Sequence, residues 1–179
     1  MATWPAVAQG ATLQQVDMGP GDAESKMSLN QIANAVRRQI DQYAKIVDAC
    51  LSELSDEQIW VPGPQGSNSI GTLAHHLSGN LRHFLGAGLL RDGYQRDRDG
   101  EFADRDIPGS VLKAELQEAL KVAHAALETI DDQLLNAPFK STDGRDFATM
   151  AHMLLLVAAH FSYHTGQINY LKRLLVERA

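Results

Sequence analysis

The chain has none of the features that would point to a disulfide scaffold, a membrane helix or a nucleic-acid surface. Cys50 is its only cysteine, which excludes an intrachain disulfide and fits a reducing compartment. No apolar run approaches the ~18 residues that a membrane helix needs. Lys and Arg total 16 against 22 Asp and Glu, which gives a net charge of −6, and the sequence contains no stretch rich in Lys and Arg. We therefore expect no nucleic-acid partner and no membrane partner.

The N-terminus also lacks a secretory signal, because no basic stretch is followed by an apolar one. We expect the protein in the cytoplasm. Residues 1–26 show no helical apolar period and contain several glycines, so we interpret them as a flexible arm. Residues 27–179 are then expected to form one domain, long enough to bury a core.

Four segments of this domain carry apolar residues at the three-four spacing of a helix with one buried face. They run from about 28 to 54, from 68 or 69 to 90, from 108 or 109 to 135, and from 147 to 176. Ser28 is the expected N-cap of the first helix, and Asn68 or Ser69 caps the second. The charged stretch 91–108 reads as a long loop, and alternating strand patterns are absent. The sequence predicts an all-α four-helix bundle.

His160 and His164 are the most informative pair of residues. They are four positions apart within an apolar helical pattern, so both imidazoles project from one face, one turn apart. Two buried imidazoles side by side repel each other when protonated, and a divalent metal removes that conflict by taking both lone pairs. The alternative is a pair of hydrogen-bonded core or surface histidines without a metal.

His76 lies between two leucines on the inward side of the second predicted helix. It is the expected third ligand, which leaves one coordination position open, as in catalytic zinc sites. His75 points about 100° away and should border the site or the solvent. Asn80 and His83 follow on the same side as His76, which is an unusual row for a dry core, and we expect them near a substrate.

The segment Ser69–Leu77 together with His160-x-x-x-His164-x-Gly166-Gln167-Ile168 resembles the DinB-like family, whose superfamily includes YfiT-like proteins and metal-dependent thiol transferases. The resemblance covers about residues 28–178, and within the superfamily the chain is similar to an uncharacterised branch. It implies a four-helix bundle of DinB/YfiT type, a divalent metal such as nickel or zinc on His76, His160 and His164, and a homodimer. Apolar residues remaining on the first and third helices are consistent with a dimer.

Other residues around this motif are candidates for substrate binding. Arg96, Arg98 and Glu101 are expected either to bind an anionic co-substrate or close over the pocket, or to form a solvated charged loop. Gln167 can reach the side of the helix that carries His164, where its amide would bond a ligand or a neighbouring helix. Gly166 would let another backbone approach closely, at a helix cost of about 1 kcal/mol.

The resemblance and the three neutral ligands together favour an enzyme that transfers a low-molecular-weight thiol to a small electrophile. Three imidazoles leave the ion its full charge, and a coordinated thiol ionises readily. No Glu adjoins the histidines in sequence, unlike the His-Glu-x-x-His pattern, which weighs against a hydrolase. A metal-dependent hydrolase and a non-enzymatic, dimeric stress-response or small-molecule-binding bundle are the alternatives.

Overall fold

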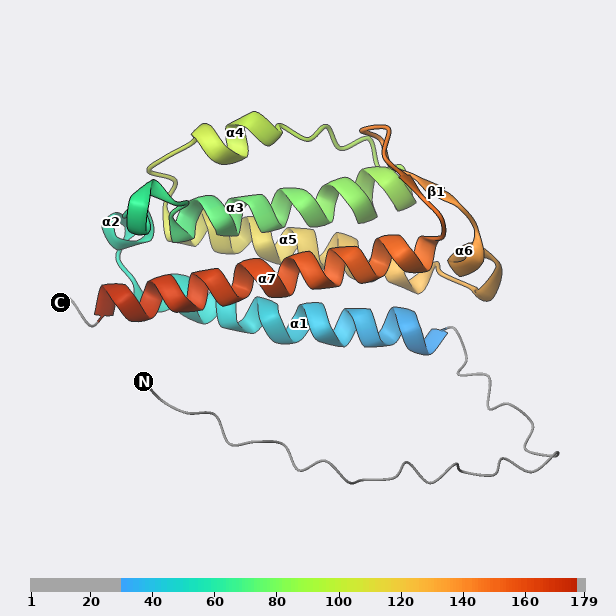
Figure 1. Ribbon diagram of the computed structural model, residues 1–179, viewed down its shortest axis with the longest axis horizontal. Coiled ribbons are helices and arrows are strands. Elements are labelled where there is room, and N and C mark those ends of the chain that lie inside the picture. The colour runs from blue at the N-terminus through green and yellow to red at the C-terminus, as the bar shows by residue number, and fades with distance from the viewer. Residues whose placement is uncertain (1–29, 177–179) are drawn as a thin grey trace, which may run out of the picture.

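The computed structural model describes residues 30–176, and the predicted flexible arm and the Ser28 cap lie outside the described residues. Figure 1 shows four long helices side by side, with the short helix Arg98–Ala103 lying over one of them and the other short elements at their ends. The elements in chain order are α1 (Asn30–Glu53), α2 (Asp56–Ile59), the 3₁₀ turn η1 (Pro64–Gly66), α3 (Ile70–Leu81), the π-helical segment η2 (Arg82–Leu90), α4 (Arg98–Ala103), α5 (Gly109–Glu128), α6 (Asp132–Asn136), β1 (Phe139–Lys140), β2 (Asp146–Phe147) and α7 (Met150–Val176).

The long helices form a closed bundle in which α1 contacts α5 and α7, and α3 contacts the same two helices. In Figure 1, α3 and its continuation η2 run parallel to α5, while α1 and α7 run in the opposite direction. Residues 91–108 must therefore cross the whole length of the bundle before α5 begins, and α4 lies within this crossover. The predicted all-α bundle is confirmed, and its topology places α4 over the α3 side of the molecule.

Local sequence explains where these helices begin and what they bury. Ser69 is the N-cap of α3, because its hydroxyl accepts a hydrogen bond from the Thr72 amide at 3.1 Å. In α1 the apolar residues at helical spacing are buried, and Cys50 is among them at 2% exposure. The core is made largely of leucine, isoleucine and alanine from the four long helices, with Phe84 and Phe161 as its largest fully buried side chains.

Two predicted helix boundaries are wrong. The third helix ends at Glu128 instead of continuing to Leu135, because Asp131 caps a separate helix, α6, by accepting from the Leu134 amide at 2.8 Å. The fourth begins at Met150, because Phe147 pairs with Phe139 in a short antiparallel hairpin. This hairpin, β1 and β2, was not expected. The predicted 91–108 loop also contains one regular element, α4.

The exposed large apolar side chains do not lie where the sequence suggested for a dimer. Among the described residues, α1 exposes none and α5 exposes only Val111, whereas α7 exposes Leu155, Leu156, Tyr163, Tyr170 and Val176. The apolar residues of the first and third predicted helices therefore do not support a dimer, and the homodimer stays a prediction from the family resemblance. Within residues 30–176, no helix is both long enough and apolar enough to cross a membrane.

Candidate metal centre

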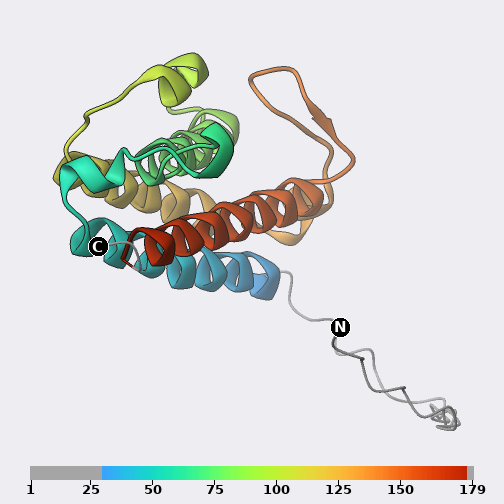
Figure 2. The ribbon, with the colours of Figure 1, turned by 60° about the vertical axis from the view of Figure 1, so that its left-hand side comes forward.

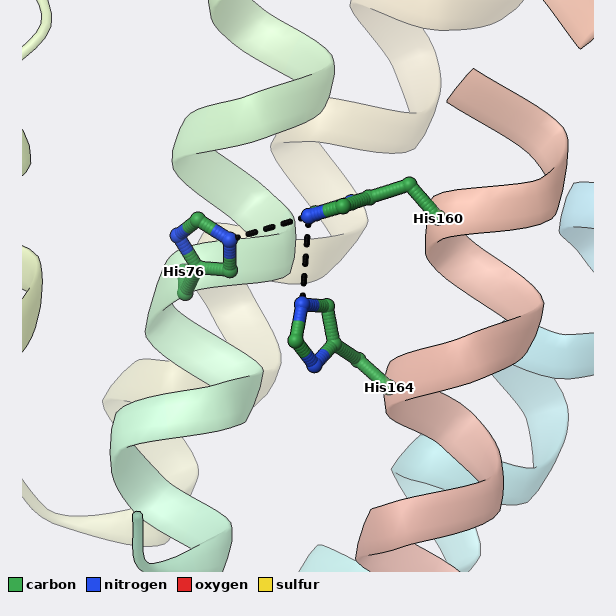
Figure 3. Close-up of side chains that lie close together, drawn as sticks. All are labelled: His76, His160 and His164. Atoms are coloured by element: carbon green, nitrogen blue, oxygen red, sulfur yellow. Dashed lines mark hydrogen bonds between the residues drawn. The ribbon is translucent and has the colours of Figure 1, made fainter. Parts of the chain in front are cut away.

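Three histidines meet between α3 and α7. Figure 3 shows His76 projecting from α3 toward His160 and His164 on α7. The Nε2 atom of His160 lies 3.1 Å from His76 Nε2 and 3.1 Å from His164 Nε2. One ligand atom from each residue lies within 4.8 Å of the others. The structure thus brings together the three residues that the sequence proposed as ligands, and it uses His76 rather than His75.

The outer nitrogens of two of these imidazoles are held by hydrogen bonds. His76 Nδ1 lies 2.8 Å from Glu101 Oε2, and His164 Nδ1 lies 2.6 Å from Gln167 Oε1. An oxygen acceptor at this distance requires the proton on Nδ1, which leaves the Nε2 lone pair directed at the centre of the cluster. Metal-ligating histidines in proteins are oriented in this way by a carboxylate or amide behind the ring.

Arg96 also approaches His76 Nδ1, with its Nη2 atom at 3.2 Å. If Nδ1 carried no proton it would accept from this guanidinium, but its lone pair would then face the Glu101 carboxylate at 2.8 Å. The arrangement without that repulsion has Nδ1 protonated and both groups donating to Glu101 Oε2, to which Arg96 Nη2 also lies at 2.8 Å.

Glu101 is the most deeply buried charge of the site, at 3% exposure. Arg96 binds both of its oxygens, at 2.6 Å through Nε and 2.8 Å through Nη2. Burial by itself would raise the pKa of Glu101, but the hydrogen bonds from His76 and Arg96 outweigh burial and hold the pKa below its usual value. The carboxylate is therefore ionised behind His76.

Gly79 makes room for this carboxylate. A Cβ atom built at position 79 would lie 1.9 Å from Glu101 Oε1, which is closer than nonbonded atoms can approach. Phe102, the next residue of α4, packs against His76 with ring centroids 4.8 Å apart. One turn of α3 and one of α4 thus enclose the His76–Glu101 pair.

The protonation state of His160, the third imidazole, indicates whether a cation fits between the three rings. Burial, together with the facing His164 and His76, lowers the pKa of His160 to about 4, and burial likewise lowers the pKa of His164. Neutral His160 can donate one hydrogen bond from Nε2, either to His76 Nε2 or to His164 Nε2. The lone pair of the other nitrogen, also 3.1 Å away, then receives no proton. Its Nδ1 atom is buried without a partner among the described residues.

A divalent ion would remove this conflict, because all three Nε2 lone pairs could bind it with the His160 proton on Nδ1. Two of the Nε2 separations are 3.1 Å and the three ligand atoms lie within 4.8 Å of one another, close enough for one ion to bind all three. The residues present therefore fit a metal ion with three imidazole ligands. Three protein ligands leave one position for a substrate.

The other predicted site residues fall into three groups. Gln167 contacts the cluster through His164, and Arg96 contacts it through His76 and Glu101. Asn80 and His83 are buried further along α3 and η2, outside the cluster. Arg98 is exposed on α4, where its guanidinium lies 5.1 Å from the Phe102 ring centroid.

Sequence reasoning missed the role of Glu101. No Glu adjoins the histidines along the chain, but the crossover returns Glu101 to His76 from 25 positions away. His75 also has a carboxylate, Glu115 Oε2 at 2.8 Å from Nδ1, and is half-buried outside the cluster. The only sequence signal for Glu101 was Gly79, a small residue one turn after His76.

Comparisons with known proteins agree with this geometry. Residues 28–179 match the family described as protein of unknown function DUF1572. The fold is similar to that of YfiT from Bacillus subtilis, described as a probable metal-dependent hydrolase with an unusual four-helix bundle topology. The TM-score is 0.64 at 21% identity, over 87% of this chain and 91% of that one.

The fold is also similar to that of a mycothiol-dependent maleylpyruvate isomerase, with a TM-score of 0.59 at 10% identity. That match covers 76% of this chain and 60% of the isomerase. No curated protein matches the chain. At these identities the two structures establish the shared fold.

Proposed function

We propose that this chain, which belongs to the DUF1572 family, is a divalent-metal-dependent enzyme that transfers a low-molecular-weight thiol to a small electrophile. The observation that carries the proposal is the convergence of three Nε2 atoms, two of them with their protons fixed on the far side of the ring. His76, His160 and His164 would hold the ion, zinc or nickel. When bound, the ion lowers the pKa of a coordinating thiol or water molecule.

The position of Glu101 favours a thiol over water as the nucleophile. A general base must lie within hydrogen-bond reach of the proton that it removes. Glu101 lies on the Nδ1 side of His76, opposite the Nε2 atom that faces the cluster, and Arg96 occupies both its oxygens. A thiol ionises more easily than water and needs no such base. Likeness in fold to a mycothiol-dependent enzyme supports the same choice.

The protein's own residues would orient and shield the reacting groups. Glu101 fixes the ring of His76, Gln167 fixes the ring of His164, and Phe102 covers His76 on the side of α4. A cavity of about 370 Å³ is lined by Gln167, Leu73 and Tyr170, and Gln167 also contacts the proposed ligand His164. A thiol co-substrate with an apolar part would fit there.

Metal-dependent hydrolysis is the second candidate, supported by the likeness in fold to YfiT. The two functions differ in which molecule coordinates the ion. Cobalt-substituted protein should be titrated with a panel of low-molecular-weight thiols while its absorption spectrum is recorded. Direct coordination produces an intense sulfur-to-metal charge-transfer band, and His164→Ala should abolish both the band and turnover.

A spectrum that no physiological thiol perturbs would reject thiol transfer. Hydrolysis of a panel of small esters and amides by the same metal-loaded sample would then identify the hydrolase. A metal-loaded protein that performs neither reaction would leave the non-enzymatic, small-molecule-binding role.

A further inference from the structure

A second cavity, of about 420 Å³ and with several charged side chains in its wall, lies between the crossover and the tip of the hairpin. Arg91, Arg96 and Arg98 line it from the crossover, and His83 and Asp143 line it from η2 and the hairpin. In Figure 2 these two segments, α4 with its flanking chain and the hairpin, rise on either side above the layer of long helices. The cavity volume lies in the usual range for small-molecule sites.

The charges in this cavity do not cancel. Arg96 is neutralised by Glu101, and the only carboxylate in the wall, Asp143, is bound by Arg145 Nη2 at 2.7 Å. Among the ion pairs of residues 30–176, none involves Arg91 or Arg98. Two arginines without carboxylate partners therefore face one cavity in a chain whose net charge is −6. Such a wall attracts an anion.

Arg91 stands where helices usually place glycine. It ends η2 in the left-handed conformation, with φ 55° and ψ 42°. A residue with a Cβ atom is unfavourable in that conformation, and glycine is the common choice at this position. An arginine in this unfavourable conformation, in the wall of a cavity, is consistent with a use for its side chain.

His83 adds a polar group to the same wall. The residue is 5% exposed, and its Nε2 atom lies 3.3 Å from Asp143 Oδ2. Its other nitrogen, Nδ1, lies 3.3 Å from Thr142 Oγ1 on the hairpin. Both imidazole nitrogens of His83 thus face the hairpin, and the Asp143 carboxylate has His83 as well as Arg145 beside it.

The cavity is joined to the metal centre by direct contacts. Arg96 reaches from its wall to His76 Nδ1, at 3.2 Å. Arg98 lies over the ring of Phe102, and Phe102 packs against His76. A molecule held by Arg98 would thus be separated from a metal ligand by one aromatic ring.

We propose that this cavity binds the acidic group, a carboxylate or a phosphate, of a small organic substrate, with Arg91 and Arg98 as its principal ligands. Guanidinium groups bind both anions in a bidentate manner. The identification of this molecule as the electrophile rests on the proposed function. Binding of the anion itself does not, because the cavity walls are complete without a metal.

The test measures anion binding to the full chain by isothermal titration calorimetry, on metal-free and zinc-loaded protein. The probes are succinate, glycerol phosphate and the uncharged analogue succinamide. The variants are Arg91→Gly, Arg98→Gln and their combination. Arg38→Gln is the matched control, because Arg38 is an exposed arginine on α1. Zinc affinity and the melting temperature are recorded for every variant.

We expect one of the two acids to bind with a Kd below about 10 mM and succinamide not to bind. Each arginine variant should weaken that binding about tenfold or more, and the control should not. Arg91→Gly should do so while keeping or raising the melting temperature, because glycine relieves the left-handed strain. The acid that binds more tightly identifies the carboxylate or the phosphate class.

Three results would overturn the inference: no binding of either acid, equal binding of succinamide, or acid binding that both arginine variants leave unchanged. Zinc binding separates this failure from that of the proposed function. Protein that binds the acid but no divalent metal retains the anion site and loses the metal enzyme. Protein that binds zinc at the three histidines but neither acid loses the anion site alone.

Discussion

His76 on α3 donates a hydrogen bond from Nδ1 to Glu101 Oε2 at 2.8 Å, although the two residues are 25 positions apart and the start of the crossover lies between them. This bond fixes both the orientation and the protonated nitrogen of the imidazole. If the three histidines hold a metal ion as proposed, the affinity for that ion depends on a side chain of α4 as well as on the ligands. The dependence is measurable.

Glu101→Gln should weaken zinc binding by about 10–100-fold, since loss of a carboxylate behind a ligating histidine typically has this effect. The measurement is a competition titration with a chromophoric chelator, with a thermal melt to establish that the variant folds. Glu115→Gln is the matched control, because Glu115 makes the same 2.8 Å contact with the adjacent His75, which is not a proposed ligand. Equal losses in the two variants would contradict the role given to Glu101.

Metal removal should destabilise the protein without unfolding it. The apolar core of the four long helices exists without an ion, and a ligand at a hundredfold excess over its Kd adds about 2.7 kcal/mol. We expect chelation to lower the melting temperature by several degrees while the far-ultraviolet circular dichroism at 25 °C stays helical. Complete unfolding at that temperature would show that the ion is required for folding.

His160→Ala separates the contribution of His160 to stabilisation by zinc from its contribution to the stability of the metal-free protein. It should abolish the stabilisation by zinc, but leave the melting temperature of the metal-free protein unchanged or higher. The reason is that the variant removes a buried Nδ1 atom without a hydrogen-bond partner and relieves the contact between two nitrogen lone pairs. A large loss of stability without metal would show that His160 acts mainly in packing.

The sequence predicts which three histidines meet through helical periodicity, which sets the face of each, and through the family resemblance, which pairs His76 with the other two. His160 and His164 share a face whatever the topology, and His76 lies on the apolar stripe of its own helix. Glu101 and Arg96 reach the site through the path of the crossover, which periodicity does not encode. The cap at Asp131 is a similar case, because one side chain decided between a continuous helix and a break.

The pH dependence of stability should report on His83. Burial lowers the pKa of His83 below its usual 6.5, although the nearby charge of Asp143 opposes the shift. The folded state then binds fewer protons than the unfolded state, so the contribution of His83 to stability falls as pH drops below about 6.5. Urea unfolding of metal-free protein should show wild type losing stability relative to His83→Gln between about pH 7 and pH 5.

Metal-free protein is used because protonation of ligating histidines at low pH would release a bound metal and change the stability independently of His83. His152→Gln provides the control, because His152 is exposed on α7. Wild-type and His83→Gln stabilities that stay parallel across this range would show that His83 titrates alike in the folded and unfolded states.

Two glycines in helix interiors should respond oppositely to alanine. Alanine gains about 1 kcal/mol of helix propensity over glycine at either position. At Gly166 nothing lies within 4 Å of an added Cβ, so Gly166→Ala should raise the free energy of unfolding by up to that amount. The close backbone approach expected at this glycine is absent among the described residues.

At Gly79 the same Cβ would lie 1.9 Å from Glu101 Oε1, so Gly79→Ala must displace the carboxylate from His76 or α4 from α3. The free energy of unfolding should fall, and zinc affinity should fall with it, as in Glu101→Gln. Because both variants gain the same propensity, the difference between them isolates the steric cost at the carboxylate. A Gly79→Ala protein that binds zinc as tightly as wild type would mean that the His76–Glu101 bond does not set the metal affinity.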